Sequence, residues 1–118
     1  MAAGMKSSFS RLKNWWRSIR RRNRISGVKH IRSMDDLPRR LGAALFVVER
    51  AGMPRWAVLD CPCLCGARIE VNLMTSRQPH WTLKQEGSRV SISPSLWQPE
   101  RLCGSHFFIV RNRIQWVS

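Results

Sequence analysis

Three of the four cysteines of this chain lie within five residues. Cys61, Cys63 and Cys65 belong to the hexapeptide CPCLCG, and Cys103 follows much later in CGSHFF. A disulfide within the hexapeptide would close a loop too small for the geometry that the bond requires. A chain of 118 residues also buries only a small core, and small domains are often stabilised by a bound metal. The sequence therefore predicts a metal-binding turn that is tied to a second half-site at Cys103.

The N-terminus favours this interpretation because it bears on the redox environment. The first residues, MAAGMKSSFSRLKNWWRSIRRR, lack the apolar centre of a secretory signal, and no stretch is apolar enough to cross a membrane. We therefore expect a cytoplasmic protein, in which thiols stay reduced and clustered cysteines bind metal more often than they form disulfides. The alternatives are inert buried thiols and one long disulfide to Cys103.

The net charge of +14 is unevenly distributed along the chain. Residues 1–42 hold twelve Lys/Arg and two Asp, whereas residues 43–118 hold nine Lys/Arg and five Asp/Glu. Apolar residues of this N-terminal arm recur at helical spacing: Phe9, Leu12, Trp16 and Ile19. The arm is predicted to be a basic helix followed by a linker. It either contacts an anionic surface, membrane or nucleic acid, or docks on the domain or remains a solvated tail.

From residue 43 the pattern changes to short strands. AALFVVER and RWAVLD flank the turn AGMP, WTLKQ and RVSIS surround EGS, and FFIV and RIQWV surround RN, while ARIEVNLM alternates apolar and polar residues. About seven strands result, which predicts a small antiparallel, mainly β domain with a zinc knuckle over residues 43–118. Together with the basic helix and linker of residues 1–42, the overall class is α+β. Trp81, Trp97 and Trp116 are expected in its core.

The predicted strands place both cysteine groups at strand ends, where their side chains can meet. Zn²⁺ is the expected ion because it binds thiolate and imidazole ligands tetrahedrally. Five residues compete for four positions: Cys61, Cys63, Cys65, Cys103 and His106. A shell of four cysteines is closed and leaves His106 free, whereas a shell that includes His106 leaves one thiol over. A shell of three ligands would bind a water, but thiolates weaken the metal as a Lewis acid.

Two serines are candidate nucleophiles with His106 as the base. Ser105 is adjacent to His106, and neighbouring residues of a strand point to opposite faces, so this pair is unfavourable. Ser95 in PSLW lies farther away in sequence and can converge on His106 in space. The alternative is that Ser95 and Pro94 only shape a turn.

In this order, CPCLCG-ARIEVNL, Trp81, PSLW, CGSHFF and IQW resemble the BubE family. Its members are encoded beside ubiquitin-like proteins and E1- and E2-like enzymes in bacterial ubiquitination-like operons. The resemblance covers roughly residues 43–118 and leaves the basic arm out. One departure is Leu64, where the family usually has glycine. A left-handed backbone there would strain a leucine.

The resemblance implies a serine-type peptidase that processes or removes a ubiquitin-like modifier. Carried over by position, the catalytic candidates are Ser95 and Ser105 with His106, beside a knuckle of four cysteines. This favours the four-cysteine shell, because a catalytic His106 cannot easily be a ligand as well. The second hypothesis is a non-catalytic zinc-binding adaptor that docks a ubiquitin-like protein or its E1- or E2-like enzymes. The third is nucleic-acid binding through the arm, although the domain has no base-reading motif.

Overall fold

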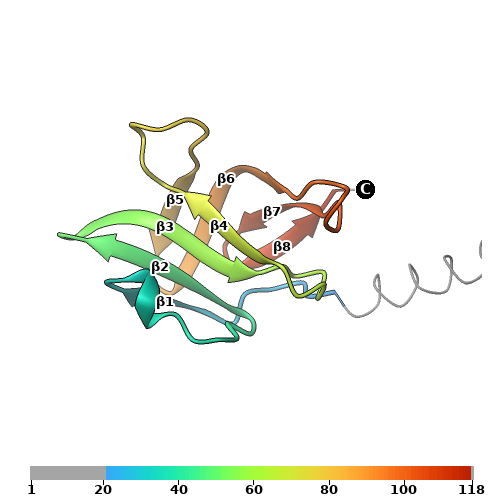
Figure 1. Ribbon diagram of the computed structural model, residues 1–118, viewed down its shortest axis with the longest axis horizontal. Helices are drawn as coiled ribbons and strands as arrows, with labels where there is room; N and C mark the ends of the chain where they lie inside the picture. The colour runs from blue at the N-terminus through green and yellow to red at the C-terminus, as the bar shows by residue number, and fades with distance from the viewer. Residues whose placement is uncertain (1–20, 118) are drawn as a thin grey trace, which may run out of the picture.

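The structure is a computed structural model that describes residues 21–117, and these form two four-stranded sheets (Figure 1). The first sheet has the order β1-β2-β3-β4: β1 (Gly27–Ile31), β2 (Ala44–Arg50), β3 (Met53–Asp60) and β4 (Arg68–Asn72). The second has the order β5-β6-β7-β8: β5 (Thr82–Glu86), β6 (Arg89–Trp97), β7 (His106–Val110) and β8 (Arg113–Trp116). A short 3₁₀ helix, η1 (Met34–Asp36), precedes β2.

The mainly β prediction is confirmed, and so are the three predicted hairpins. AGMP joins β2 to β3, EGS joins β5 to β6, and RN joins β7 to β8. Residues 21–117 contain no α-helix, so the α+β class has no support in this part of the chain. The predicted helix over residues 9–19 lies outside the described residues. Within residues 21–117, no helix is long and apolar enough to cross a membrane.

One strand lies where the sequence indicates only a linker. β1 pairs with β2 in parallel, so the first sheet is not wholly antiparallel. Ile25, just before β1, is 4% exposed and belongs to the core between the sheets. The segment GVKHI was missed because it is short, charged and only partly buried, which weakens the apolar alternation of a strand.

The core lies between the two sheets, which pack face to face. Alternate residues of each strand point inward, as the two-residue period of a strand requires. The buried side chains from both sheets are Leu45, Val47, Ala57, Leu59, Ile69, Val71, Val90, Ile92, Leu96, Phe107, Ile109 and Ile114. Cys61 is 1% exposed and belongs to this core, so one part of the cysteine cluster is anchored in it.

The outer faces of the two sheets differ. The outer face of the first sheet carries a second cluster, including Phe46 and Val58, that is covered by Met34, Leu37 and neighbouring residues. Among the described residues, no comparable cluster covers the outer face of the second sheet. Side chains on that face therefore remain accessible to a partner or substrate.

Candidate active site and metal centre

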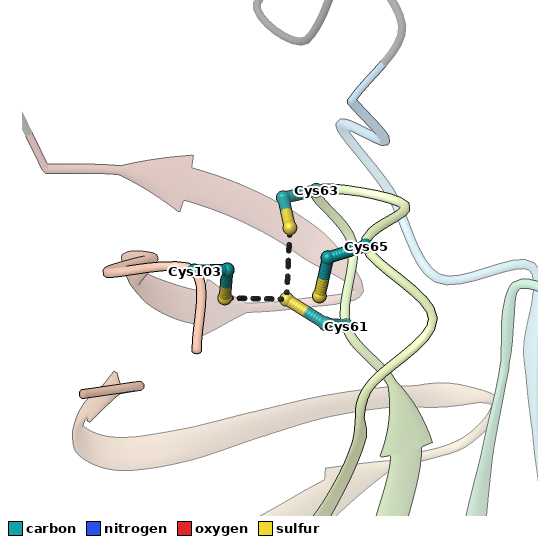
Figure 2. A group of neighbouring side chains, drawn as sticks. All are labelled: Cys61, Cys63, Cys65 and Cys103. Carbon is teal, nitrogen blue, oxygen red and sulfur yellow. Dashed lines mark hydrogen bonds between the residues drawn. The ribbon is translucent and has the colours of Figure 1, made fainter. Parts of the chain in front are cut away.

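The four cysteines converge where the two sheets meet (Figure 2). Their Sγ atoms all lie within 4.8 Å of one another. The turn between β3 and β4 supplies Cys61, Cys63 and Cys65, and the loop between β6 and β7 supplies Cys103. All four are free cysteines, and the Sγ atom of Cys61 is 3.4 Å from that of Cys63 and 3.7 Å from that of Cys103. Tetrahedral zinc with Zn–S bonds of about 2.3 Å needs sulfurs roughly 3.8 Å apart, so the donor set fits this ion.

Backbone hydrogen bonds shape the turn that carries three of these thiols. The Cys61 N–H donates to Ala67 O (2.8 Å), and the Leu64 N–H donates to Cys61 O (3.0 Å). The Ala67 N–H approaches Cys65 Sγ at 3.4 Å. An N–H group that points at sulfur stabilises negative charge there, which suits a thiolate ligand.

The other half-site is held by one carbonyl. Pro99 O accepts hydrogen bonds from the N–H groups of Leu102, Cys103 and Gly104 at 2.9, 3.2 and 3.1 Å. Gly104 has φ of 63°, a left-handed conformation that glycine adopts without steric cost. This compact loop presents Cys103 to the turn across from it.

The pKa values of three of the thiols are perturbed, and not all in the same direction. Burial raises the pKa of Cys61 and, to a smaller degree, that of Cys65. Burial also acts to raise the pKa of Cys103, but hydrogen bonds with Ser105 and with the other thiols outweigh it and lower that pKa to about 7. Cys103 therefore ionises more readily than Cys61 and Cys65, which favour the thiolate only when a cation compensates their charge.

Leu64 has φ of 68°, so the left-handed backbone expected at this departure from the family pattern is present. We expect Leu64→Gly to raise the free energy of unfolding by about 1 kcal/mol, because only glycine avoids the clash of Cβ in this conformation. The leucine side chain is 44% exposed, so its removal sacrifices little buried surface. Urea denaturation of the metal-loaded protein measures the change. Leu64→Ala is the control, since alanine keeps the clash. Equal stability of the two variants would contradict this account.

His106 and Ser95 meet on the open outer face of the second sheet. The Nε2 atom of His106 is 2.8 Å from the Oγ atom of Ser95. Strand register explains the contact: His106 lies opposite Trp97 in the β6–β7 pair, and Ser95 shares a face with Trp97 two residues away. Ser95 and His106 are therefore diagonal neighbours across two strands, close enough for their side chains to touch.

Ser105, the other predicted nucleophile, lies elsewhere. It is 8% exposed, and its Oγ atom is 3.3 Å from the Sγ atom of Cys103. The cluster of four cysteines, whose Sγ atoms lie within 4.8 Å of one another, does not include His106. The structure thus brings Ser95 to His106 and places Ser105 beside the thiols.

Trp97 was expected in the core, and that expectation is wrong. Its side chain is 69% exposed, and its ring stacks on that of His106 with centroids 4.8 Å apart and planes inclined by 9°. The seven acidic residues of the chain all lie within residues 21–117, and none of them hydrogen-bonds to His106. The imidazole is therefore oriented by a stacked indole instead of a carboxylate. The two-residue spacing between Ser95 and Trp97 is the signal that could have placed both on one outer face.

The Ser95–His106 pair and the cluster of four cysteines are connected through the loop between β6 and β7. Cys103 precedes His106 by one short segment, and the Gln98 N–H donates to Ser105 O (2.8 Å) to close the loop between β6 and β7. On the other side, the Trp81 indole N–H donates to Ser95 O at 3.2 Å. The loop that carries Cys103 therefore sets where β7 begins and hence where the imidazole stands.

A cavity of about 720 Å³ lies at the ends of β6 and β7 that are farther from Ser95 and His106. Its lining includes four arginines: Arg24, Arg89, Arg111 and Arg113. It contains neither a histidine nor a cysteine, so it offers no base or thiolate. The cavity is cationic and separate from the serine–histidine pair.

The family model described as "Bacterial ubiquitination-like system serine protease (BubE)" matches residues 33–117. This span includes all four cysteines, Ser95 and His106. No curated protein and no solved structure matches the chain.

Proposed function

Because this chain belongs to the BubE family, we propose that it is a serine-type peptidase of a bacterial ubiquitination-like system. Its task would be to process a ubiquitin-like modifier or to remove it from its target. The 2.8 Å contact between Ser95 Oγ and His106 Nε2 on an accessible face carries this proposal. A hydroxyl in contact with an imidazole is the arrangement that acyl transfer requires.

Each residue has a defined part in the reaction. The Ser95 oxygen attacks the scissile carbonyl carbon while His106 Nε2 takes the hydroxyl proton. The imidazolium then gives that proton to the leaving group, the bond to the leaving group breaks, and an ester to Ser95 remains. Water, deprotonated by His106, attacks the ester and releases a carboxylate, and the proton returns to Ser95. The stacked Trp97 ring keeps the imidazole plane in position through both stages.

We propose that the four cysteines hold a zinc ion, with Cys61, Cys63, Cys65 and Cys103 as its ligands. A shell of four thiolates is closed, so the ion would supply a crosslink between the two sheets and no site for a reactive water. This leaves His106 available as the base. The hydrogen bonds that Ala67 and Ser105 make with the sulfurs are outer contacts of the kind found around such sites.

A fluorophosphonate probe tests the assignment of the nucleophile. We expect the wild-type protein to be labelled on the peptide that contains Ser95, because His106 activates this hydroxyl. Ser95→Ala should abolish the labelling, whereas the matched control Ser105→Ala should retain it. Intact-mass and peptide mass spectrometry give the readout. Labelling that persists in Ser95→Ala, or that is absent from the folded wild type, would refute the peptidase assignment.

A non-catalytic adaptor is the second candidate, and the exposed aromatics favour it. Trp97 and Phe108 are 69% and 39% exposed on one face, and exposed aromatic patches are typical of protein-binding surfaces. An adaptor would bind the ubiquitin-like protein or its conjugating enzymes equally well as the wild type and as the Ser95→Ala variant. It would also remain unlabelled by the probe.

Nucleic-acid or membrane binding by the basic arm stays a prediction, because the predicted helix of the arm lies outside the described residues. The structure does define how to test it. Deleting residues 1–42 would remove β1 and the buried Ile25, so the deletion should stop at residue 20. Binding that falls steeply with salt and disappears in this variant would support the prediction.

A further inference from the structure

A groove of about 190 Å³ separates an edge of the first sheet from an edge of the second. We call it the β4–β6 groove, and the residues that line it are Arg68, Ile69, Glu70, Val71, Trp81, Leu96, Trp97 and Gln98. β4 is the last strand of its sheet, and β4 and β6 belong to different sheets. Two strand segments therefore border one narrow space without pairing across it.

The backbone of β4 presents unpaired groups on this side. The Cys61 N–H bonds to Ala67 O and the Leu73 N–H bonds to Arg55 O, which sets the alternation of the β3–β4 ladder. In that alternation the N–H and C=O groups of Arg68 and Glu70 point away from β3. No backbone or side-chain hydrogen bond within residues 21–117 occupies them.

The facing segment of β6 has the same property. The Gln98 N–H bonds to Ser105 O, so the N–H and C=O groups of Trp97 and Ser95 point away from β7. On that side β5 pairs with β6 only as far as Ser93. In the described part of the chain the backbone N–H and C=O of Trp97 have no partner.

Trp81 connects the two edges at one end of the groove. Its backbone N–H donates to Asn72 O at the end of β4 (2.8 Å). Its indole N–H donates to Ser95 O in β6 (3.2 Å). Trp81 thus hydrogen-bonds to one backbone carbonyl on each edge. Within residues 21–117, the other outward N–H and C=O groups of both edges stay unpaired, close to the Ser95 hydroxyl.

We propose that the β4–β6 groove binds an extended segment of the substrate protein, which adds as a strand between β4 and β6. This deepens the proposed peptidase function and rests on it for the role of the bound segment. Unpaired N–H and C=O groups on an edge strand are the template that β-strand addition uses. Leu96 and Trp97 directly follow Ser95, so a strand held here passes next to the reactive hydroxyl.

The size of the groove defines the chemistry of the occupant. At about 190 Å³ it is smaller than the pockets of about 300–1,000 Å³ that hold drug-sized ligands. A main chain with small side chains fits, and recognition then comes mainly from backbone hydrogen bonds. Such a site accepts an exposed tail of a folded protein and excludes a helix, whose diameter is about 10 Å or more.

Amide exchange in the Ser95→Ala protein tests strand addition without any turnover. The probe is a synthetic peptide with the C-terminal sequence of a ubiquitin-like protein of a bacterial ubiquitination-like system. At saturating peptide we expect the exchange of the Arg68, Glu70 and Trp97 amides, followed by NMR, to slow by about tenfold or more. The amide of Phe108, which lies opposite Gln115 in the β7–β8 pair and away from both edges, should not change.

A proline substitution supplies an independent measurement. Glu70→Pro deletes one outward N–H without removing a hydrogen bond of the β3–β4 ladder, and proline is tolerated on such an edge. We expect peptide affinity to fall by about tenfold, the effect of one lost backbone hydrogen bond in a desolvated site. Glu70→Ala is the matched control, because it removes the side chain but keeps the N–H. Equal melting temperatures of the two variants would show that folding is not the cause.

The outcomes separate this inference from the proposed function. A peptide that fails to protect these amides overturns the groove assignment, even if the fluorophosphonate labels Ser95. Protection without labelling supports the groove and contradicts the peptidase. Protection of the same amides by raised protein concentration alone would assign the groove to self-association and overturn the proposal.

Discussion

Ser95→Ala will leave the protein folded and metal-loaded but will abolish cleavage of a modifier–reporter fusion. We expect the turnover rate to fall on the order of 10⁴-fold or more, as when a serine nucleophile is removed from a serine–histidine pair. The reason is that the Oγ atom 2.8 Å from His106 forms the covalent bond of the first step. The fusion carries the ubiquitin-like protein at its N-terminal side, and release of the reporter measures the rate.

Three further variants complete this measurement. His106→Ala should lose about as much activity, and the double variant should lose no more than either single one, because the two residues act as a unit. Ser105→Ala should retain activity, since its hydroxyl contacts Cys103 and not His106. Loss of bound metal from His106→Ala alone would show that His106 is a ligand and would defeat its assignment as the base.

Removal of the proposed zinc ion will cost the protein most of its stability. Structural zinc sites supply about 10–16 kcal/mol of apparent binding free energy, which is as large as the whole stability of a typical domain. Here the ion would join the turn after β3 to the loop before β7, and so the two sheets. We expect the reduced protein to bind one Zn²⁺ and to lose its cooperative melting transition in the presence of a chelator.

Single cysteine substitutions are expected to lower the stability to different degrees. Cys61→Ser should be more damaging than Cys65→Ser, because Cys61 is 1% exposed within the core whereas Cys65 is exposed. Peptidase activity should fall together with metal content. The reason is that the loop carrying Cys103 determines the position of β7, whose first residue is His106. Elemental analysis and melting curves are the measurements. A metal-free protein whose melting curve ignores the chelator would refute the zinc assignment.

Local chemistry was readable from the sequence because it depends on neighbouring residues. The alternation in ARIEVNL predicted β4, and the turns AGMP, EGS and RN predicted the three hairpins. The turn at residues 61–66 was expected as a ligand-bearing segment, and the family resemblance drew attention to a left-handed backbone at Leu64. Strand GVKHI was missed, because a short edge strand with charged residues has little periodic signal.

Contacts between distant segments depended on register, which residue types do not reveal. Whether Ser95 or Ser105 meets His106 depends on which residue of β6 lies opposite His106 in β7. The irregular stretch of β6 between Ile92 and Leu96 shifts that pairing. For the same reason, Trp97 could not be distinguished from a core aromatic until the outer face of its sheet was known.

The sequence by itself determined a β protein with clustered cysteines, because thiol spacing, apolar alternation and turn residues act over a few positions. Only the tertiary structure decided which residues share a site. It gathered four thiols and left His106 outside them, paired His106 with Ser95, and opened a groove beside that pair. These outcomes follow from how two sheets pack and in which register their strands pair. A shift of one residue in register would have turned Ser95 to the opposite face.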